Sequence, residues 1–112
     1  MAAQVNWRES FDAAQQEAKA AYKPVLLEFY MDTCPHCMKL HQETLTDAAV
    51  IEAVNARFIP VRLEGRQHMD LVQQFNVRGA PTTLIFAPEG KELHRFAGFL
   101  PPAEYLAELD KA

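Results

Sequence analysis

The only two cysteines of the chain, Cys34 and Cys37, stand three positions apart, shortly after the apolar run Val25–Tyr30. Pro35 follows the first cysteine, and proline suits the first turn of a helix because its missing N–H would be unpaired there anyway. The pattern therefore predicts a strand that leads into a helix beginning at the Cys-x-x-C motif. A motif in this setting is typical of a dithiol/disulfide redox centre.

The two cysteines are predicted to have different roles. Only a thiolate attacks a disulfide, and a free cysteine with a pKa of about 8.5 is mostly protonated at neutral pH. A helix N-terminus presents positive potential to Cys34, and His36 adds to this stabilisation if it is protonated or donates a hydrogen bond. We therefore expect Cys34 to be the exposed nucleophile. Cys37, nearly one turn further along the same helix face, is expected to be the resolving thiol.

Glu28 is the one charged residue of the apolar run. If helices cover this strand on both sides, the carboxyl group is buried and its pKa is raised. A neutral or half-titrated carboxyl beneath Cys37 could accept the proton that Cys37 must lose before it attacks. The alternative is an edge carboxylate that faces solvent. Arg62, on the next predicted strand, either pairs with Glu28 or lies in solvent.

A second candidate element is the segment that contains Ala80 and Pro81 before a predicted strand. A proline at the entry of a strand removes a ladder donor and often has a cis peptide bond in a tight turn. The backbone of Ala80 is then left for an extended substrate segment to pair with, which supplies affinity without side-chain specificity. The alternative interpretation is an ordinary loop proline.

The rest of the pattern predicts an α/β domain. Apolar residues at helical spacing predict an amphipathic helix over residues 7–22, and Asp47 can cap a helix that reaches Val54 after an interruption at residues 44–47. The other elements expected are strands at residues 58–63, 82–87 and 92–97, a turn at 88–91, and helices at 70–75 and 102–109. The sheet then combines parallel and antiparallel pairs.

Composition limits the size of the fold and its partners. One domain over residues 1–112 is expected, because a chain of this length that is 49% hydrophobic can bury about two-thirds of its unfolded surface. The net charge of -4 leaves no basic stripe, so nucleic acid is not expected as a partner. No apolar run approaches the roughly 20 residues of a membrane helix, so membrane insertion is not expected. Residues 1–6 lack the apolar core of a signal peptide, although Met1 could stand in place of a removed leader.

Together these features resemble the thioredoxin superfamily, over essentially the whole chain. The apolar strand, the Cys-x-x-C motif, the Gly-Ala-Pro-Thr segment and the closing hairpin and helix occur in the order of that family. The resemblance implies a thioredoxin fold, that is, a central four-stranded mixed sheet flanked by helices, here with an extra N-terminal helix. It further implies protein thiols and disulfides as substrates, an upstream redox partner protein, no cofactor, and a monomer.

The resemblance also implies roles for individual residues. Glu28 corresponds to the buried proton relay of the family, and Pro81 to its cis-proline, with Ala80 in the substrate-binding position. Gly98 corresponds to a glycine of the substrate groove. Arg62 stands where thioredoxins commonly carry a lysine.

The chain departs from standard thioredoxins at the motif. Thr33 replaces the usual tryptophan, and Pro35 and His36 replace Gly-Pro between the cysteines. Pro-His is the pair of the oxidase DsbA, but the chain has no room for the helical insertion of that protein. Segments 23–27 and 43–47 are more similar to the C-terminal domain of DsbD and to related small periplasmic thioredoxins. This resemblance implies a reductase in the periplasm, with the cytoplasm as the alternative, whereas His36 favours an oxidising couple.

Two other functions are left open. Cys34, Cys37 and His41 fall on one helix face and form a soft ligand set for copper(I) or zinc, although no fourth ligand is evident. A glutaredoxin-like enzyme that uses glutathione is the second alternative. His68 and His94 show no partner pattern and are expected at the surface.

Overall fold

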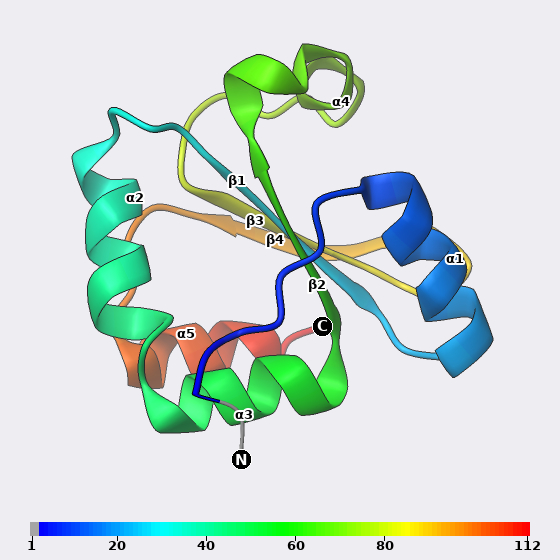
Figure 1. Cartoon of the computed structure of the whole chain (residues 1–112), viewed down its shortest axis with the longest axis horizontal. Coiled ribbons are helices and arrows are strands. Elements are labelled where there is room, and N and C mark those ends of the chain that lie inside the picture. The colour runs from blue at the N-terminus through cyan, green and yellow to red at the C-terminus, as the bar shows by residue number, and fades with distance from the viewer. Residues whose placement is uncertain (1–2) are drawn as a thin grey trace.

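The computed structural model describes residues 3–112, which form a four-stranded sheet with helices on both faces (Figure 1). The elements follow one another as α1 (Phe11–Ala21), β1 (Val25–Tyr30), α2 (Pro35–Lys39), the π-helical turn η1 (Leu40–Thr44), α3 (Ala48–Arg57), β2 (Ile59–Glu64), the 3-10 turn η2 (Gly65–Gln67), α4 (Met69–Gln74), β3 (Thr82–Phe86), β4 (Glu92–Ala97) and α5 (Pro102–Leu109). The strand order is β2-β1-β3-β4. The predicted α/β fold with a mixed four-stranded sheet is confirmed.

β1 lies inside the sheet, between a parallel and an antiparallel neighbour. It runs parallel to β2, which places Glu28 opposite Arg62, and antiparallel to β3, which places Glu28 opposite Thr83. β3 pairs with β4 in the predicted antiparallel hairpin. Since side chains alternate along a strand, Leu26, Glu28 and Tyr30 share one face of the sheet.

Each face of the sheet carries its own apolar core. The face that holds Leu27 and Phe29 packs against α1, and the face that holds Leu26 packs against α3 and α5 (Figure 1). The buried residues on the α1 side are Phe11, Ala14, Ala18, Val25, Leu27, Phe29, Ile59, Val61, Leu63, Leu84 and Phe86. Because β1 is covered on both sides, its sequence is apolar at nearly every position.

The first helix begins later than the apolar spacing predicts. α1 starts at Phe11 instead of residue 7, because the Ser10 hydroxyl group accepts a hydrogen bond from the N–H of Ala13 at 3.2 Å and so acts as the N-cap. The helix ends at Ala21, and the C-cap residue Tyr22 adopts the left-handed conformation with φ 54°. No helix among residues 3–112 is both long enough and apolar enough to cross a bilayer.

The two outer strands of the sheet have different surroundings. The residues before α1 run along β2, where the N–H of Arg8 donates to the Pro60 carbonyl at 2.8 Å and the N–H of Arg62 donates to the Arg8 carbonyl at 3.1 Å. β4 forms the opposite edge. Its exposed residues Glu92 and Arg95 form an ion pair of 2.6 Å.

The predicted interruption between two helices after the Cys-x-x-C motif is confirmed. α2 passes directly into η1, in which the N–H of Leu45 donates to the Leu40 carbonyl at 3.0 Å, five positions back. The Asp47 carboxylate then accepts from the N–H of Val50 at 3.1 Å and caps α3. α3 continues to Arg57 and is longer than predicted.

His68 and His94 are both partly exposed, but His94 has a partner that the sequence did not predict. Nε2 of His94, on β4, lies 2.8 Å from Oε1 of Glu108 on α5. His68 precedes α4 directly. The strand register that brings His94 over α5 is a tertiary feature, and the local sequence carries no signal for it.

Phe11 provides a test of how α1 is held against the sheet. Its ring centroid lies 5.4 Å from those of Phe75 and Phe86, edge to face in both pairs. Phe11→Ala should lower the free energy of unfolding by roughly 3–5 kcal/mol, because the change removes apolar contacts and leaves a cavity. Urea unfolding followed by circular dichroism measures the change.

The matched control is Gln16→Ala on the exposed face of α1, which should change stability by less than about 0.5 kcal/mol. Equal losses in the two variants would contradict a core position for Phe11.

Candidate active site

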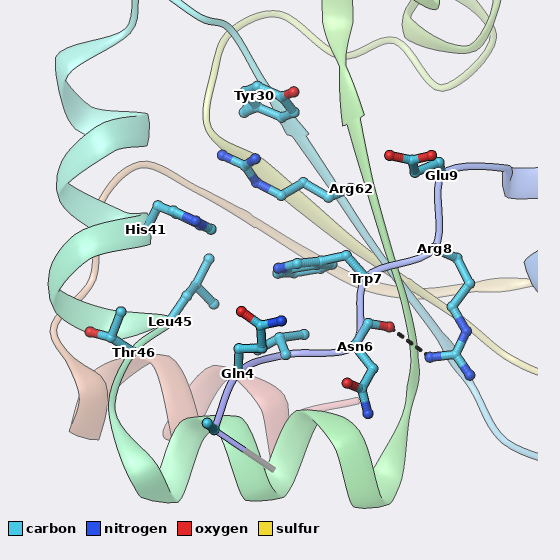
Figure 2. Close-up of a pocket in the computed structure, with 12 residues that line it drawn as sticks. Gln4, Asn6, Trp7, Arg8, Glu9, Tyr30, His41, Leu45, Thr46 and Arg62 are labelled. Atoms are coloured by element: carbon cyan, nitrogen blue, oxygen red, sulfur yellow. Dashed lines mark hydrogen bonds between the residues drawn. The ribbon is translucent and has the colours of Figure 1, made fainter.

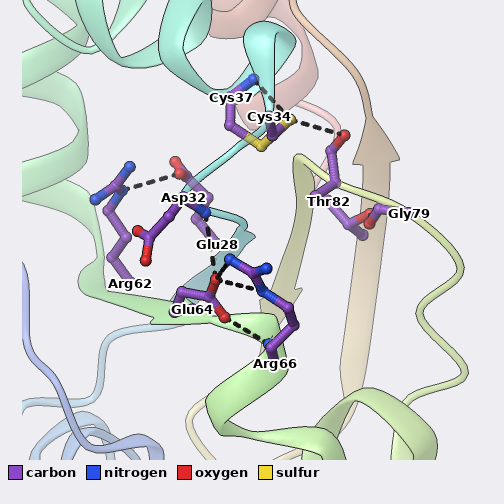
Figure 3. Close-up of a disulfide and its surroundings, with 10 residues drawn as sticks. Glu28, Asp32, Cys34, Cys37, Arg62, Glu64, Arg66, Gly79 and Thr82 are labelled. Atoms are coloured by element: carbon purple, nitrogen blue, oxygen red, sulfur yellow. Dashed lines mark hydrogen bonds and ion pairs between the residues drawn. A yellow bond between two sulfur atoms is a disulfide. The ribbon is translucent and has the colours of Figure 1, made fainter.

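Cys34 and Cys37 are joined by a disulfide at the beginning of α2 (Figure 3). Cys34 is the N-cap residue, Pro35 is the first helical residue, and Sγ of Cys34 accepts a hydrogen bond from the N–H of Cys37 at 3.0 Å. Cys37 is 1% exposed, whereas Cys34 is half-buried. The predicted position of the motif at a helix N-terminus is confirmed, and Cys34 is the more accessible cysteine.

The surroundings of Cys34 favour negative charge on its sulfur in the reduced form. The N–H of Cys37 is directed at Sγ, and the unpaired N–H groups of the first turn add positive potential. His36 is exposed on that turn, and its ring forms no hydrogen bond with any residue in the described part of the chain. Any contribution of His36 to the thiolate is therefore through its charge and not through a hydrogen bond of this structure.

The segment before β3 lies against the disulfide. The Ala80 carbonyl oxygen is 3.5 Å from Sγ of Cys34, and the peptide bond between Ala80 and Pro81 is cis. Gly98, after β4, donates from its N–H to the Pro81 carbonyl at 2.9 Å, with a φ of 88° that favours glycine. The structure thus brings Ala80, Pro81 and Gly98 together. A hollow of about 350 Å³ runs along them.

Glu28 is fully buried below the disulfide, with no exposed surface (Figure 3). Nε of Arg62 donates to its Oε2 at 3.1 Å, while Oε1 has no hydrogen-bond partner among the described residues. The predicted pairing of Glu28 with Arg62 is confirmed, and the alternatives of an edge carboxylate and a solvated arginine are wrong. Burial raises the pKa of Glu28 to about 7, although the charge and the hydrogen bond of Arg62 oppose the rise.

Tyr30 holds the Arg62 guanidinium in place. The guanidinium carbon lies over the Tyr30 ring, 3.6 Å from its centroid. A cavity of about 250 Å³ is bordered by Arg62, Tyr30, Cys37 and His41. Cys37 therefore faces the same space as the arginine that binds Glu28. The sequence analysis did not identify Tyr30, although its place two positions after Glu28 on a strand puts both side chains on one face.

A larger hollow of about 870 Å³ lies between the N-terminal segment and η1 (Figure 2). Trp7 and Leu45 contribute to its walls, and it shares Tyr30, His41 and Arg62 with the smaller cavity. The side chain of Arg62 is 21% exposed, while that of Glu28 is 0% exposed. Arg62 is therefore the member of the pair that meets solvent.

A second acidic residue, Glu64, holds the loop before the cysteines. Its carboxylate accepts from the N–H of Asp32 at 3.2 Å and from the N–H of Arg66 at 2.6 Å, and it pairs with the Arg66 guanidinium at 2.8 Å (Figure 3). The hydrogen bond from Arg66 lowers the pKa of Glu64. Glu64 thus stays charged and ties the loop at Asp32 to the end of β2. The sequence analysis missed this contact, because β2 ends one residue later than predicted.

The ligand set predicted for a metal is not assembled. No group of three His, Cys, Asp or Glu side chains that could hold a metal ion occurs within residues 3–112. Cys34 and Cys37 are bonded to each other, and His41 lies beside Arg62. Burial and the neighbouring Arg62 lower the pKa of His41.

Comparison with known proteins identifies the family. The model of the thioredoxin-like domain matches residues 11–112. The chain belongs to the thioredoxin-like family. Among curated relatives, the thiol:disulfide interchange protein DsbD of Yersinia pestis is 33% identical over 97 residues, and a DsbD of Pseudomonas aeruginosa is 36% identical over 84 residues. The two matches cover 82% and 72% of this thioredoxin-like chain but 16% and 14% of the relatives, so the chain spans about a sixth of their length.

Solved structures have the same fold. A thioredoxin from Thermus thermophilus has a TM-score of 0.86 and 26% identity, covering 96% of this chain and 86% of that one. The DsbH oxidoreductase has a TM-score of 0.86 at 22% identity, covering 97% and 84%. The oxidised C-terminal domain of Neisseria meningitidis DsbD has a TM-score of 0.75 at 21% identity, covering 94% and 97%. The predicted thioredoxin fold is confirmed, and the family and the Cys34–Cys37 disulfide support thiol–disulfide exchange at this site.

The pKa of Glu28 predicts how stability depends on pH. The pKa is about 7 in the folded protein against 4.5 for an ordinary glutamate, so between these values the native state holds a proton that the unfolded chain has released. Stability from this group is therefore present at low pH and is lost as the pH rises through about 7. The free energy of unfolding should fall by roughly 3 kcal/mol between about pH 4.5 and 8 on account of Glu28.

Urea unfolding of the oxidised protein at a series of pH values measures this loss. Glu28→Gln should remove most of the decline, because glutamine does not titrate. Glu52→Gln, on the exposed side of α3, is the control and should leave the decline in place. The assignment is contradicted if Glu28→Gln and the wild type lose the same free energy over the range.

Proposed function

We propose that this chain is a thiol:disulfide oxidoreductase that exchanges its Cys34–Cys37 disulfide with cysteine pairs of other proteins. The observation that carries the proposal is the position of the partly exposed Cys34, whose Sγ is held at a helix N-terminus 3.5 Å from the Ala80 carbonyl oxygen. An extended polypeptide can pair with the Ala80 backbone and so bring its own sulfur to Cys34. Cys37 is 1% exposed and is bonded to Cys34, so it is placed to attack that residue and not a large substrate.

In the reducing direction the Cys34 thiolate attacks one sulfur of a substrate disulfide. The new bond joins Cys34 to the substrate, and the other substrate sulfur leaves as a thiolate that takes up a proton. Cys37 then loses its proton and attacks Sγ of Cys34, which releases the second substrate thiol. The substrate gains two electrons and two protons, and the protein ends with the Cys34–Cys37 disulfide seen in the structure.

The residues around the disulfide support these steps. Pro35 starts the helix whose N–H groups stabilise the Cys34 thiolate, and His36 adds positive charge when it is protonated. Glu28, with a pKa of about 7, is half ionised at neutral pH and accepts the proton that Cys37 gives up. The cavity of about 250 Å³ that borders both Cys37 and Arg62, the partner of Glu28, is large enough for water molecules to carry this proton toward the carboxylate.

The substrate backbone binds along Ala80, Pro81 and Gly98. These residues border one hollow, and the backbone of Ala80 forms no backbone hydrogen bond within the described residues. Every group that the reaction uses lies within one copy of the chain, which supports action as a monomer.

We further propose that the chain acts as a reductase in the periplasm, supplied with electrons by an upstream redox protein. The likeness to the thiol:disulfide interchange protein DsbD, which covers 82% of the chain for the Yersinia pestis protein, supports this proposal. Thr33 in place of the usual tryptophan, and Pro35 and His36 between the cysteines, distinguish the chain from standard thioredoxins.

Trapping tests the roles of the two cysteines. Cys37→Ala should accumulate mixed disulfides between Cys34 and an oxidised substrate such as insulin, because the resolving thiol is gone. Non-reducing gel electrophoresis with mass spectrometry of the adducts identifies the bonded cysteine. Cys34→Ala is the control and should form no adduct and reduce no insulin. Insulin reduction by Cys34→Ala at the wild-type rate would refute the proposal.

The reduction potential tests the direction of electron flow. Equilibration with glutathione buffers should give a potential closer to the value of about -270 mV typical of thioredoxin than to the value of about -120 mV of a strong oxidase. His36→Ala should shift the potential to more negative values, because it removes positive charge beside the Cys34 thiolate. Lys19→Ala, which removes a positive charge from the exposed face of α1, serves as the control. A wild-type potential near about -120 mV is incompatible with a reductase.

A further inference from the structure

The hollow between the N-terminal segment and η1 has the dimensions of a binding site. Its volume of about 870 Å³ lies within the range of about 300–1,000 Å³ that is usual for sites of small molecules. The side chains of Trp7, His41 and Arg62 point toward it from the N-terminal segment, η1 and β2 (Figure 2). The hollow is therefore bordered by side chains from three elements that are far apart in the sequence.

Hydrogen bonds fix the N-terminal wall of the hollow. The N–H of Asn6 donates to Oδ1 of Asn55 at 2.9 Å, and Nδ2 of Asn55 donates to the Gln4 carbonyl at 3.0 Å. Arg8 is paired with β2 through its backbone, and Val5 is 5% exposed in the core that includes α3 and α5. The wall is thus tied down at both ends, and a preformed site lowers the entropic cost of binding a ligand.

Arg62 presents unused hydrogen-bond donors to the hollow. A guanidinium group has five N–H donors. Nε donates to Glu28 at 3.1 Å, whereas Nη1 and Nη2 donate to no acceptor within residues 3–112. The group is held in one orientation because it lies over the Tyr30 ring, 3.6 Å from the centroid. Two coplanar nitrogen atoms in a fixed position match the two oxygen atoms of a carboxylate.

The other charges at the hollow leave Arg62 as the group that attracts a ligand. Arg8 also borders the hollow, but its guanidinium is bound to the Glu17 carboxylate. Glu9 is the one carboxylate of the described lining, and it is exposed. Burial and the neighbouring Arg62 lower the pKa of His41, so this ring is neutral at pH 7 and does not repel or attract an ion. An anion is therefore the complementary ligand.

Trp7 and Leu45 give the hollow an apolar surface. Leu45 is 3% exposed, and Trp7 packs against the same core while it borders the hollow. The flat indole ring suits another flat ring, because aromatic pairs gain free energy beyond the area that they bury. A ligand that combines a carboxylate with an aromatic ring would use both Arg62 and this surface.

We propose that this hollow binds a small aromatic carboxylate, whose oxygen atoms pair with Nη1 and Nη2 of Arg62 and whose ring lies against Trp7. The site is separate from the hollow along Ala80 and Pro81, and the inference does not depend on the oxidoreductase function. Binding is linked to Glu28, because the ligand and Glu28 share one guanidinium.

The single tryptophan of the chain makes binding directly observable. In nitrogen-labelled, oxidised protein, the indole N–H of Trp7 gives one NMR signal. Titration with benzoate or naphthoate should shift this signal and saturate with a Kd of about 1 mM or lower. Benzamide has the ring without the charge, and acetate has the charge without the ring. Each should bind at least about tenfold more weakly than benzoate.

Two substitutions test the charge at the site. Arg62→Gln removes the paired donors and should weaken benzoate binding at least about tenfold. His41→Glu places a negative charge on the exposed wall without removing the bond between Arg62 and Glu28, and it should weaken binding at least about fivefold. Because His41 is exposed, this variant tests the site even if Arg62→Gln does not fold.

Each variant has a matched control outside the hollow. Arg57→Gln removes an exposed arginine of α3 that is paired with Asp110. Gln73→Glu adds a negative charge to the exposed face of α4. Both should bind benzoate with the affinity of the wild type.

Glu28 provides a second readout, because its charge offsets that of Arg62 only when it is ionised. The pKa of Glu28 is about 7, so the wild type should bind benzoate about threefold or more tightly at about pH 6 than at about pH 8. Glu28→Gln should bind equally well at the two pH values, with the affinity of the wild type at the lower pH.

The other groups around Glu28 do not produce this dependence. Burial raises the pKa of Tyr105 on α5, so it stays neutral, and Cys37 does not titrate while it is bonded to Cys34. Asp32, at the border of the smaller cavity, is exposed. His41 is the remaining group, and its contribution is measured by the dependence that Glu28→Gln retains.

The inference is overturned if neither aromatic carboxylate shifts the Trp7 signal at about 10 mM, or if benzamide binds as tightly as benzoate. It is also overturned if His41→Glu binds benzoate as tightly as Gln73→Glu does. Equal affinity of the wild type at the two pH values contradicts the sharing of Arg62 with Glu28. Saturable binding that requires the ring, the charge and Arg62 supports the site.

Discussion

The start of α2 at Cys34 is the constraint on which the rest of the site depends. Because Cys34 is the N-cap, the N–H of Cys37 points at the sulfur of Cys34. Cys37 lies about one helical turn further along and is buried. The same geometry divides the two thiols into an accessible one and a buried one. The backbone of the helix start therefore gives the two cysteines their different roles. Side chains such as that of His36 change only how strongly the Cys34 thiolate is stabilised.

The burial of Glu28 in β1 is the second constraint, and it has a cost. A carboxylate without exposed surface loses the free energy of its hydration. The ion pair with Arg62 compensates for only part of this loss, because Oε1 of Glu28 has no partner among the described residues. The protein keeps a group that destabilises it at neutral pH. A buried ionisable residue that lowers stability in this way is typical of a functional site. The cavity bordered by both Arg62 and Cys37 connects Glu28 to the thiol that must be deprotonated.

Much of the fold and site could be predicted because it depends on residues close together in the sequence. The apolar pattern of Val25–Tyr30 was enough to place the strand before the cysteines and to suggest a buried Glu28. The contact with Arg62 could be stated only as one of two alternatives, since strand register is a tertiary property. The start of α1 was misplaced because apolar spacing does not show that the backbone before Ser10 pairs with β2.

The two outer strands limit how copies of the protein can meet. At β2 the backbone of Arg8 already occupies bonding groups that a foreign strand would need. At β4 the charged side chains of Glu92 and Arg95 stand on the edge, and charged residues there discourage the addition of further strands. Growth of the sheet into aggregates is disfavoured on both sides. The chain can therefore hold an accessible sulfur at its surface without offering a free strand edge to its neighbours in a crowded solution.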